Sequence, residues 1–290
     1  LRVKTKANLG AYLSTFSSCV PTYLYAPLLS GQYDIPAIYC EVEGIYTTSA
    51  PVDAYRGAGR PEATFLVERI IEKAARETGT DPATFRRKNF VKSFPHQTPV
   101  IMAYDTGNYT ASLDLALEMA DYKNFAKRKK DSVKNGKLRG IGISTVIENT
   151  GLGNAPVDEV EIALDASGTV TVYNVAKSQG QSHETTFAQI VAKALQIPIE
   201  QIKIVQCTPG TTLKGNGTGG SRSTVGAGSV SHLAAHKLIE AGKALAALEM
   251  KLEPSQINYA NGEFRSARFA DGSNITPHKR TGLRTSCSPR

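Results

Sequence analysis

A glycine-punctuated basic loop that runs directly into a periodic helix constrains the fold of this chain more than any other stretch. The loop covers positions 53–62, and its glycines and arginines are Arg56, Gly57, Gly59 and Arg60. Glycine adopts φ > 0 and lets backbone N–H groups approach a ligand, and arginine adds a cationic fork. Over positions 61–78, apolar pairs recur every four residues, which predicts an amphipathic helix. The sequence therefore predicts an anion or cofactor cradle at a helix N-terminus, although glycine spacing alone favours an ordinary turn.

The length and composition of the chain set its expected domain organisation. With 290 residues and 41% hydrophobic content, the chain is long enough for two domains with cores of their own. Helical periodicity and β-branched runs occur in both halves, which predicts an α+β fold made of two mixed α/β subdomains. A basic stretch at 127–136 is the predicted boundary. We expect the domains at 1–125 and 126–276, and at 277–290 either a disordered tail or a segment foreign to both domains.

Local patterns predict the remaining elements. Asp81-Pro82 supplies an N-cap and a first-turn proline for a short helix that ends near Asn89. Turn residues 165–168 join two alternating runs into a hairpin, and Asn261-Gly262 marks another. Further helices are predicted at 112–120, at 124–136, after residue 186 and after residue 224, and strands at 35–46, 138–147, 160–164 and 170–175.

The four cysteines form no metal or disulfide signature. They are scattered without a C-x-x-C pair, at Cys19, Cys40, Cys207 and Cys287. Cys40 is predicted to be a small core residue rather than a nucleophile. The sequence has no apolar run of about 18 residues and no export signal. A reducing, cytoplasmic compartment without membrane association is therefore expected.

The net charge of +8 is concentrated in two segments. Positions 127–139 hold seven Lys or Arg against one Asp, and four more basic residues follow Pro277. No aromatic residues alternate with these cations, as a stacking platform for bases would require. The charge therefore indicates a solvated helix face and a basic tail, and nucleic-acid binding is not expected.

Two further glycine-containing loops precede predicted helices. The first, at 178–186, includes His183 and Glu184, which at a helix start are favoured as cap groups over a metal or acid/base pair. The second, at 215–224, combines glycines and hydroxyls with Arg222 ahead of a long helix, an arrangement that suits a phosphate. It lacks Gly-Lys-Ser and Gly-Lys-Thr, so a Walker-type nucleotide loop is not predicted.

The residues of the three loops, in this order, resemble one family, the molybdenum hydroxylase large subunits of the xanthine dehydrogenase and aldehyde oxidase family. The branch is the one labelled carbon monoxide dehydrogenase-like, form II. Residues 54–60 match its Ala-Tyr-Arg-Gly-Ala-Gly-Arg loop. Residues 180–189 resemble its Gly-Gln-Gly-His-Glu-Thr-Thr-Phe-Ala-Gln segment, with Ser182 in place of a glycine. Residues 217–223 resemble its Gly-Thr-x-Gly-Ser-Arg-Ser segment.

The resemblance implies a molybdopterin site built from these loops. It places Arg56, Gln181 and Gly220 around the molybdenum, with Arg56 and Gln181 as catalytic residues. In the family, the glutamine that matches Gln181 donates to an oxygen ligand of the metal, a task that suits an uncharged amide. The implied cofactor-binding residues are Tyr55, Arg56, Gly57, Ala58, Gly59, Gly180, Gln181, Ser182, His183, Gly220, Ser221, Arg222, Ser223 and Thr224.

Two departures from the family pattern carry expectations of their own. The branch that oxidises carbon monoxide holds copper with a cysteine in the first loop, whereas positions 57–59 contain no thiol. Carbon monoxide is therefore not expected as the substrate. Ser182 replaces a glycine, and if this position has φ > 0 the serine is strained.

The resemblance also implies an activity and a set of partners. The expected enzyme oxidises a C–H bond of an aldehyde or N-heterocycle with water as the oxygen source. Its expected cofactor is molybdopterin cytosine dinucleotide, with 2Fe-2S and FAD on partner subunits and a dimer of heterotrimers as the complete assembly. The family's first metal loop would precede Leu1, and nothing after Ser266 resembles its general-base glutamate. The chain is therefore expected to lack both ends of the subunit and to be inactive alone.

Two other classes of function stay open on the sequence. A phosphate- or nucleotide-binding module would use the helix start at 220–224 without molybdenum. An inactive, interaction-only fragment would fit the missing glutamate. Detection of bound molybdenum separates the hydroxylase from both.

Overall fold

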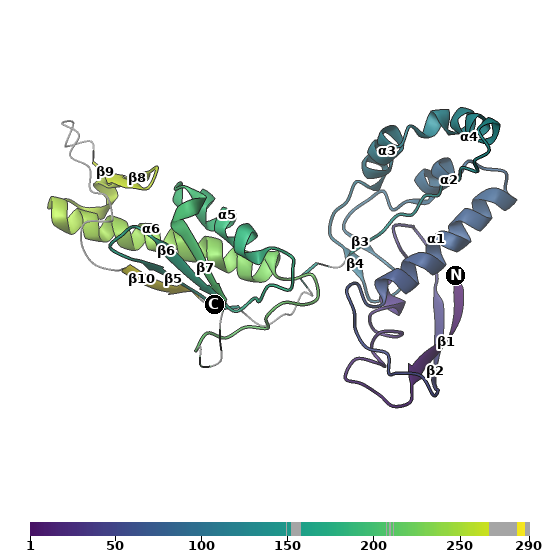
Figure 1. Cartoon of the computed structure of the whole chain (residues 1–290), viewed down its shortest axis with the longest axis horizontal. Helices are drawn as coiled ribbons and strands as arrows, with labels where there is room; N and C mark the ends of the chain where they lie inside the picture. Colours follow the sequence, from purple (N-terminus) through teal and green to yellow (C-terminus); the bar gives the residue numbers. More distant parts are fainter. Residues whose placement is uncertain are drawn as a thin grey trace. The chain divides into compact units, whose positions relative to one another are not determined.

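The computed structural model describes residues 1–148, 150–151, 158–206, 208, 210 and 212–266, and the backbone of 283–287. The chain forms two compact units, Leu1–Glu148 and Asn149–Arg290, whose helices and strands are labelled in Figure 1. Both units combine helices with small sheets, so the predicted α+β class is confirmed. Within the described residues, no helix is both long and apolar enough to cross a membrane.

The first unit packs its helices against a two-stranded parallel sheet. Strand β1 (Arg2–Gly10) pairs in parallel with β2 (Tyr39–Tyr46), and β3 (His96–Gln97) forms a short hairpin with β4 (Ala103–Tyr104). The helices are α1 (Arg60–Glu77), α2 (Pro82–Asn89), α3 (Tyr109–Met119) and α4 (Phe125–Lys134), with 3-10 turns at Ala26–Leu28 and Tyr122–Asn124. The main hydrophobic core cluster of this unit comprises the buried residues Val3, Tyr25, Leu28, Leu29, Tyr33, Ala63, Val67, Phe90 and Leu113.

The predicted helix starts of this unit are explained by their caps. The carboxylate of Asp81 accepts a hydrogen bond from the Thr84 N–H at 2.8 Å, which confirms the predicted N-cap of α2. Helix α3 begins three residues before the predicted start because Asn108, rather than a serine, caps it by accepting from the Ala111 N–H at 3.1 Å. Cys40 packs half-buried against the core, in agreement with its predicted structural role.

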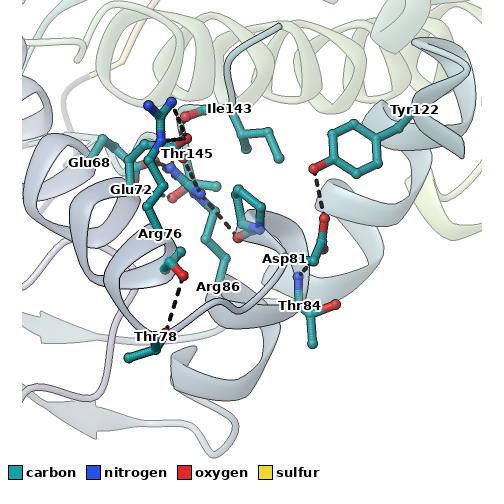
Figure 2. A network of polar contacts seen from close by, with 12 residues as sticks. Glu68, Glu72, Arg76, Thr78, Asp81, Thr84, Arg86, Tyr122, Ile143 and Thr145 are labelled. Carbon is teal, nitrogen blue, oxygen red and sulfur yellow. Dashed lines mark hydrogen bonds and ion pairs between the residues drawn. The ribbon is translucent and has the colours of Figure 1, made fainter. Parts of the chain in front are cut away.

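The segment predicted as a strand at 138–147 is not a strand, because side chains from distant helices take up its polar groups (Figure 2). The buried guanidinium of Arg86 donates to the Ile143 carbonyl at 2.9 Å. The same guanidinium donates twice to Glu68, at 3.0 and 2.9 Å, and once to Glu72, at 3.2 Å. Thr145 donates to Glu68 at 2.8 Å. These bonds fasten the segment to α1 and α2, so residues 126–148 belong to the first compact unit, beyond the predicted boundary at 125/126.

The second unit is a four-stranded sheet with two helices packed on it. The sheet order is β10-β5-β6-β7, where β5 (Val160–Leu164) and β6 (Val170–Asn174) form the predicted antiparallel hairpin. Strand β7 (Ile202–Gln206) runs parallel to β6 and is reached through α5 (His183–Leu195). Helix α6 (Ser229–Met250) packs with α5 against the sheet (Figure 1). The remaining elements are β8 (Asn258–Ala260), β9 (Glu263–Arg265), 3-10 turns at Ile199–Gln201 and Pro254–Gln256, and a π-helical turn at Thr224–Gly228.

Two predictions for the end of the chain meet different outcomes. The hairpin predicted around Asn261-Gly262 is confirmed by the antiparallel pair β8 and β9. Strand β10 (Leu283–Cys287) lies inside the segment predicted as a disordered tail, yet its backbone pairs antiparallel with β5. The other residues of 277–290 lie outside the described part of the chain.

Candidate functional site

Two of the three predicted loops lie together in the second unit. The Thr218 hydroxyl, in the loop at 215–224, donates to the Lys177 carbonyl at 2.6 Å. Lys177 directly precedes the polar turn that carries Gln181. This hydrogen bond joins the turn at the start of α5 to the loop at the start of α6. The third predicted loop, at 54–60, belongs to the first unit.

The turn that carries Gln181 is held at both ends by one carboxamide. Gln206, at the end of β7, accepts a hydrogen bond from the Ser178 N–H at 2.9 Å through Oε1. Its Nε2 donates to the carboxylate of Glu184. The exposed Gln181 accepts from the Gln179 N–H through Oε1, and its Nε2 group has no partner among the described residues. The turn therefore presents an oriented amide donor to solvent.

The start of α5 is an uncapped helix N-terminus. Ser182 occupies the N-cap position with φ 61° and ψ 44°, and its side chain makes no capping hydrogen bond. The conditional prediction of strain is thus fulfilled, because this is the left-handed region. The first N–H groups of α5 point along the helix axis without an intrahelical acceptor, which favours an anion at this end.

His183 does not act as a cap, contrary to the sequence-based preference. Its ring is 5% exposed, with Nδ1 3.4 Å from the Ala176 carbonyl oxygen and its centroid 4.9 Å from that of Phe187. The ring is therefore part of the core, and only the backbone of His183 faces the turn. Glu184 bonds Gln206 instead. Among the described residues, no three or more His, Cys, Asp or Glu side chains are grouped to hold a metal ion.

The loop at 215–224 is shaped by a buried ion pair. Arg222 is 5% exposed and its Nη2 lies 3.0 Å from a carboxylate oxygen of Asp158, which is 2% exposed. Arg222 also donates to the Gly217 carbonyl at 3.2 Å, and Asp158 accepts from the Asn216 N–H at 3.1 Å. The predicted cofactor-binding arginine thus points inward and holds the loop's backbone. Asp158 was not singled out in the sequence, since a lone acid before a strand gives no local signal.

The outer part of the same loop offers backbone donors. The N–H groups of Gly219 and Gly220 have no hydrogen-bond partner among the described residues, and a Cβ added at Gly219 would meet open space. Ser221 has φ 54°, and Thr224 opens the π-helical turn that continues into α6 without a side-chain cap. Successive exposed N–H groups at a helix start form a nest for oxyanions. These residues therefore fit the phosphate groups of a cofactor.

The loop of the first unit is anchored at its end. Gly59 is the N-cap of α1 with φ 81°, and a Cβ there would lie 2.2 Å from the Leu24 carbonyl oxygen. The Arg60 guanidinium lies 2.5 Å from Glu148. Tyr55 is 87% exposed, and Arg56 is exposed with no partner for its side chain among the described residues. This unit therefore presents an unengaged guanidinium next to a glycine-bounded helix start.

The family models and the curated proteins that match this chain point to the same family. Sequence profiles of two molybdopterin cofactor-binding domains match residues 1–90 and 115–282. Carbon monoxide dehydrogenase large chain of Hydrogenophaga pseudoflava is 35% identical over 91% of this chain and 35% of its own length. Nicotine 6-hydroxylase large subunit of Paenarthrobacter nicotinovorans is 33% identical over 80% of this chain and 30% of its own length.

Solved structures agree with these relatives. The crystal structure of a Cu,Mo-CO dehydrogenase in its carbon monoxide reduced state superposes with a TM-score of 0.80 at 30% identity, covering 100% of this chain and 40% of that one. Quinoline 2-oxidoreductase from Pseudomonas putida 86 superposes with a TM-score of 0.83 at 28% identity, covering 99% of this chain and 40% of that one.

The chain therefore belongs to the molybdopterin cofactor-binding domains of the molybdenum hydroxylase large subunits, and the family inferred from its three loops is confirmed. It spans about a third of the length of the curated relatives that it matches. Sequence reasoning found the loops but missed Asp158 and Gln206, which hold two of them in place.

Proposed function

We propose that this chain binds molybdopterin cytosine dinucleotide within a molybdenum-dependent hydroxylase subunit. The observation that carries the proposal is the junction of two family loops in the second unit, made by Thr218 and Lys177. Around it lie the exposed amide of Gln181 and the unpartnered N–H groups of Gly219 and Gly220. One polar amide and a nest of backbone donors suit a metal-bound oxygen and the phosphates of one extended cofactor.

The roles of individual residues follow from these placements. The N–H group of Gly219 and the hydroxyls of Ser221, Ser223 and Thr224 would hold the phosphate-containing part of the cofactor, and Gly220 would lie next to the molybdenum. Gln181 would donate its Nε2–H to an oxygen of the metal centre, because the Gln179 N–H occupies its Oε1. Arg222 acts indirectly, by keeping the loop in shape through Asp158. Arg56 would supply positive charge from the loop of the first unit, where Tyr55, Gly57, Ala58 and Gly59 line the same backbone turn.

When bound, the molybdenum supplies a redox centre at which a C–H bond is oxidised with water as the oxygen source. The substrate proposed is an N-heterocycle or an aldehyde. Relatives named as nicotine 6-hydroxylase and quinoline 2-oxidoreductase support the heterocycle, and aldehyde oxidoreductase supports the aldehyde. Carbon monoxide is not proposed, although its dehydrogenase is a relative, because positions 54–60 carry no thiol to hold copper.

The complete enzyme is proposed to pass electrons to 2Fe-2S and FAD groups on partner subunits. Two relatives are named as a large subunit and as subunit gamma of a dehydrogenase complex, which supports a multi-subunit assembly. A dimer of heterotrimers in the cytoplasm is the assembly we propose.

The proposal is tested by metal and pterin analysis of the full gene product, expressed with its neighbouring subunits in a host that makes the dinucleotide cofactor. We expect about one molybdenum per chain. An Arg56→Ala and Gln181→Ala double variant should lose most of it, because both side chains face the metal in the proposal.

A matched control keeps this test specific. Arg69→Ala with Gln189→Ala removes the same two functional groups from exposed positions of α1 and α5 that lie outside the loops. This control should retain its molybdenum. A well-folded wild-type product without molybdenum would contradict the proposed hydroxylase function. Binding of free nucleotides by that product would then favour the phosphate-binding module.

A further inference from the structure

Two exposed histidines of α6 stand one helical turn apart and are not among the residues of the proposed molybdopterin site. His232 and His236 occupy positions i and i+4, with ring centroids 4.5 Å apart and ring planes at 70°. We propose that this pair binds a divalent late first-row transition metal, with Ni²⁺ and Cu²⁺ preferred over Zn²⁺. The site uses none of the residues of the Gln181 turn or of the loop at 215–224.

The backbone that carries the two imidazoles is rigid. Residues at i and i+4 lie on the same face of a helix, one above the other. The opposite face of this part of α6 is fixed in the core by Ala234 and Leu238. Ala235 and Ile239, which are closer to the histidines, are also buried. Because the helix is formed and packed before any metal arrives, the two ligands are held at a fixed spacing. Binding therefore orders only the side-chain torsions of two histidines.

The spacing of the rings distinguishes between coordination geometries. With a metal–nitrogen bond of about 2.1 Å and about 1.2 Å from nitrogen to ring centre, cis ligands at 90° put the two ring centroids about 4.7 Å apart, and ligands at a tetrahedral angle put them about 5.4 Å apart. The observed centroid distance of 4.5 Å is closer to the spacing for 90° than to the tetrahedral spacing. Square-planar, tetragonal and octahedral ions have such cis positions, and nitrogen ligands follow the affinity order that peaks at copper.

The charged side chains near the two histidines are not expected to bind the metal, so the two imidazoles are its protein ligands. Glu240, one turn beyond His236, lies with Oε1 2.8 Å from the ammonium of Lys243. Lys237 adds a positive charge beside His236. Since no group of three or more potential metal ligands occurs among the described residues, water completes the coordination sphere. The site is therefore a two-histidine surface chelate whose affinity depends on both rings.

The test is a calorimetric titration of the full chain, freed of metal with a chelator, with NiCl₂. We expect one bound ion per chain for the wild type. His232→Ala and His236→Ala should each weaken Ni²⁺ binding about tenfold or more, because either change leaves a single imidazole. Both positions are exposed, so circular dichroism should show unchanged helix content. With Cu²⁺, electron paramagnetic resonance should report two nitrogen ligands in the wild type and fewer in each variant.

A third histidine supplies the matched control. His96 lies in the first unit with its ring against Tyr104, at a centroid distance of 6.1 Å, and no other histidine ring is in contact with it among the described residues. His96→Ala should bind Ni²⁺ as the wild type does. Equal affinities of the wild type and the two α6 variants, or a wild type that takes up no ion, would overturn the proposal. Neither result bears on molybdenum content, so the site stands or falls independently of the proposed function.

Discussion

The loops of the two units carry equally specific family motifs but are held by different kinds of contact. In the second unit, polar side chains fix the backbone: Gln206 bridges the Gln181 turn, and the buried pair of Arg222 and Asp158 shapes the neighbouring loop. In the first unit, the loop is fixed at Gly59, where backbone approaches backbone. The loops of the second unit are thus held by polar side chains, and the loop of the first unit is held by close steric contact.

This difference indicates how much of each loop is organised before a ligand binds. The donors of the second unit are set by a network that is complete within the chain, so they are available without rearrangement. The exposed side chains of Tyr55 and Arg56 make no such network contacts with the described residues. We therefore expect the phosphate-binding side to be preorganised and Arg56 to become ordered only when a ligand or a further protein segment contacts it.

The largest effect is expected when Asp158, the carboxylate that shapes the loop at 215–224 of the second unit, is removed. Asp158→Ala should lower the stability of this unit by about 3–5 kcal/mol, because it leaves the buried Arg222 without its counter-ion. Hydrogen exchange of β5 and α6 under increasing urea measures this loss for the unit concerned. Asp114→Ala, which opens the exposed pair with Arg87, should cost less than about 1 kcal/mol. Equal costs would mean that the buried pair does not organise its loop.

Steric anchoring in the first unit is tested by a pair of glycine substitutions. Gly59→Ala should destabilise the start of α1 by about 3 kcal/mol, since its Cβ would collide with the Leu24 carbonyl at a left-handed backbone position. Gly180→Ala also has positive φ, of 100°, but its Cβ would meet no atom within 4 Å. It should therefore cost only the strain of about 1–2 kcal/mol. Hydrogen exchange at the two helix starts compares them, and a larger loss at Gly180 would contradict steric anchoring.

Much of the fold follows from local sequence, and the exceptions have a common physical cause. The Asp81 cap and the hairpin at 160–174 depend on residues a few positions apart, so their patterns are readable in the sequence. The stretch at 138–147 has the composition of a strand, but the carbonyl of Ile143 is claimed by Arg86, 57 residues earlier. A contact over that separation leaves no local signal, and the strand prediction failed there.

The candidate site divides in the same way. The order of residues predicts all three loops, because the glycines and hydroxyl residues that each loop needs for its backbone conformation lie within the loop itself. The residues that hold these loops in place are distant in the sequence. Asp158 and Arg222 are 64 positions apart, and Gln206 and Ser178 are 28 positions apart. Arg222 was predicted to face the cofactor because its charge suits phosphate, whereas its burial with Asp158 is a property of the folded unit.

The smallest expected effect concerns Ser182, the residue that departs from the family pattern in the Gln181 turn. Ser182→Gly should stabilise the start of α5 by about 0.5–1 kcal/mol. Glycine relieves the strain of the left-handed backbone, and this gain exceeds the additional backbone entropy that glycine loses on folding. The matched control is Gln196→Gly at the other end of α5. Gln196 is also left-handed, with φ 49°, but its Oε1 accepts from the Asn261 N–H at 3.0 Å. Losing that bond should cancel the relief of strain. Hydrogen exchange at the two ends of α5, measured at increasing temperature, gives the change in local stability for both variants. A destabilised Ser182→Gly would show that the serine itself supports the turn, and that the polar network of the second unit extends one residue further than Gln206 and Glu184.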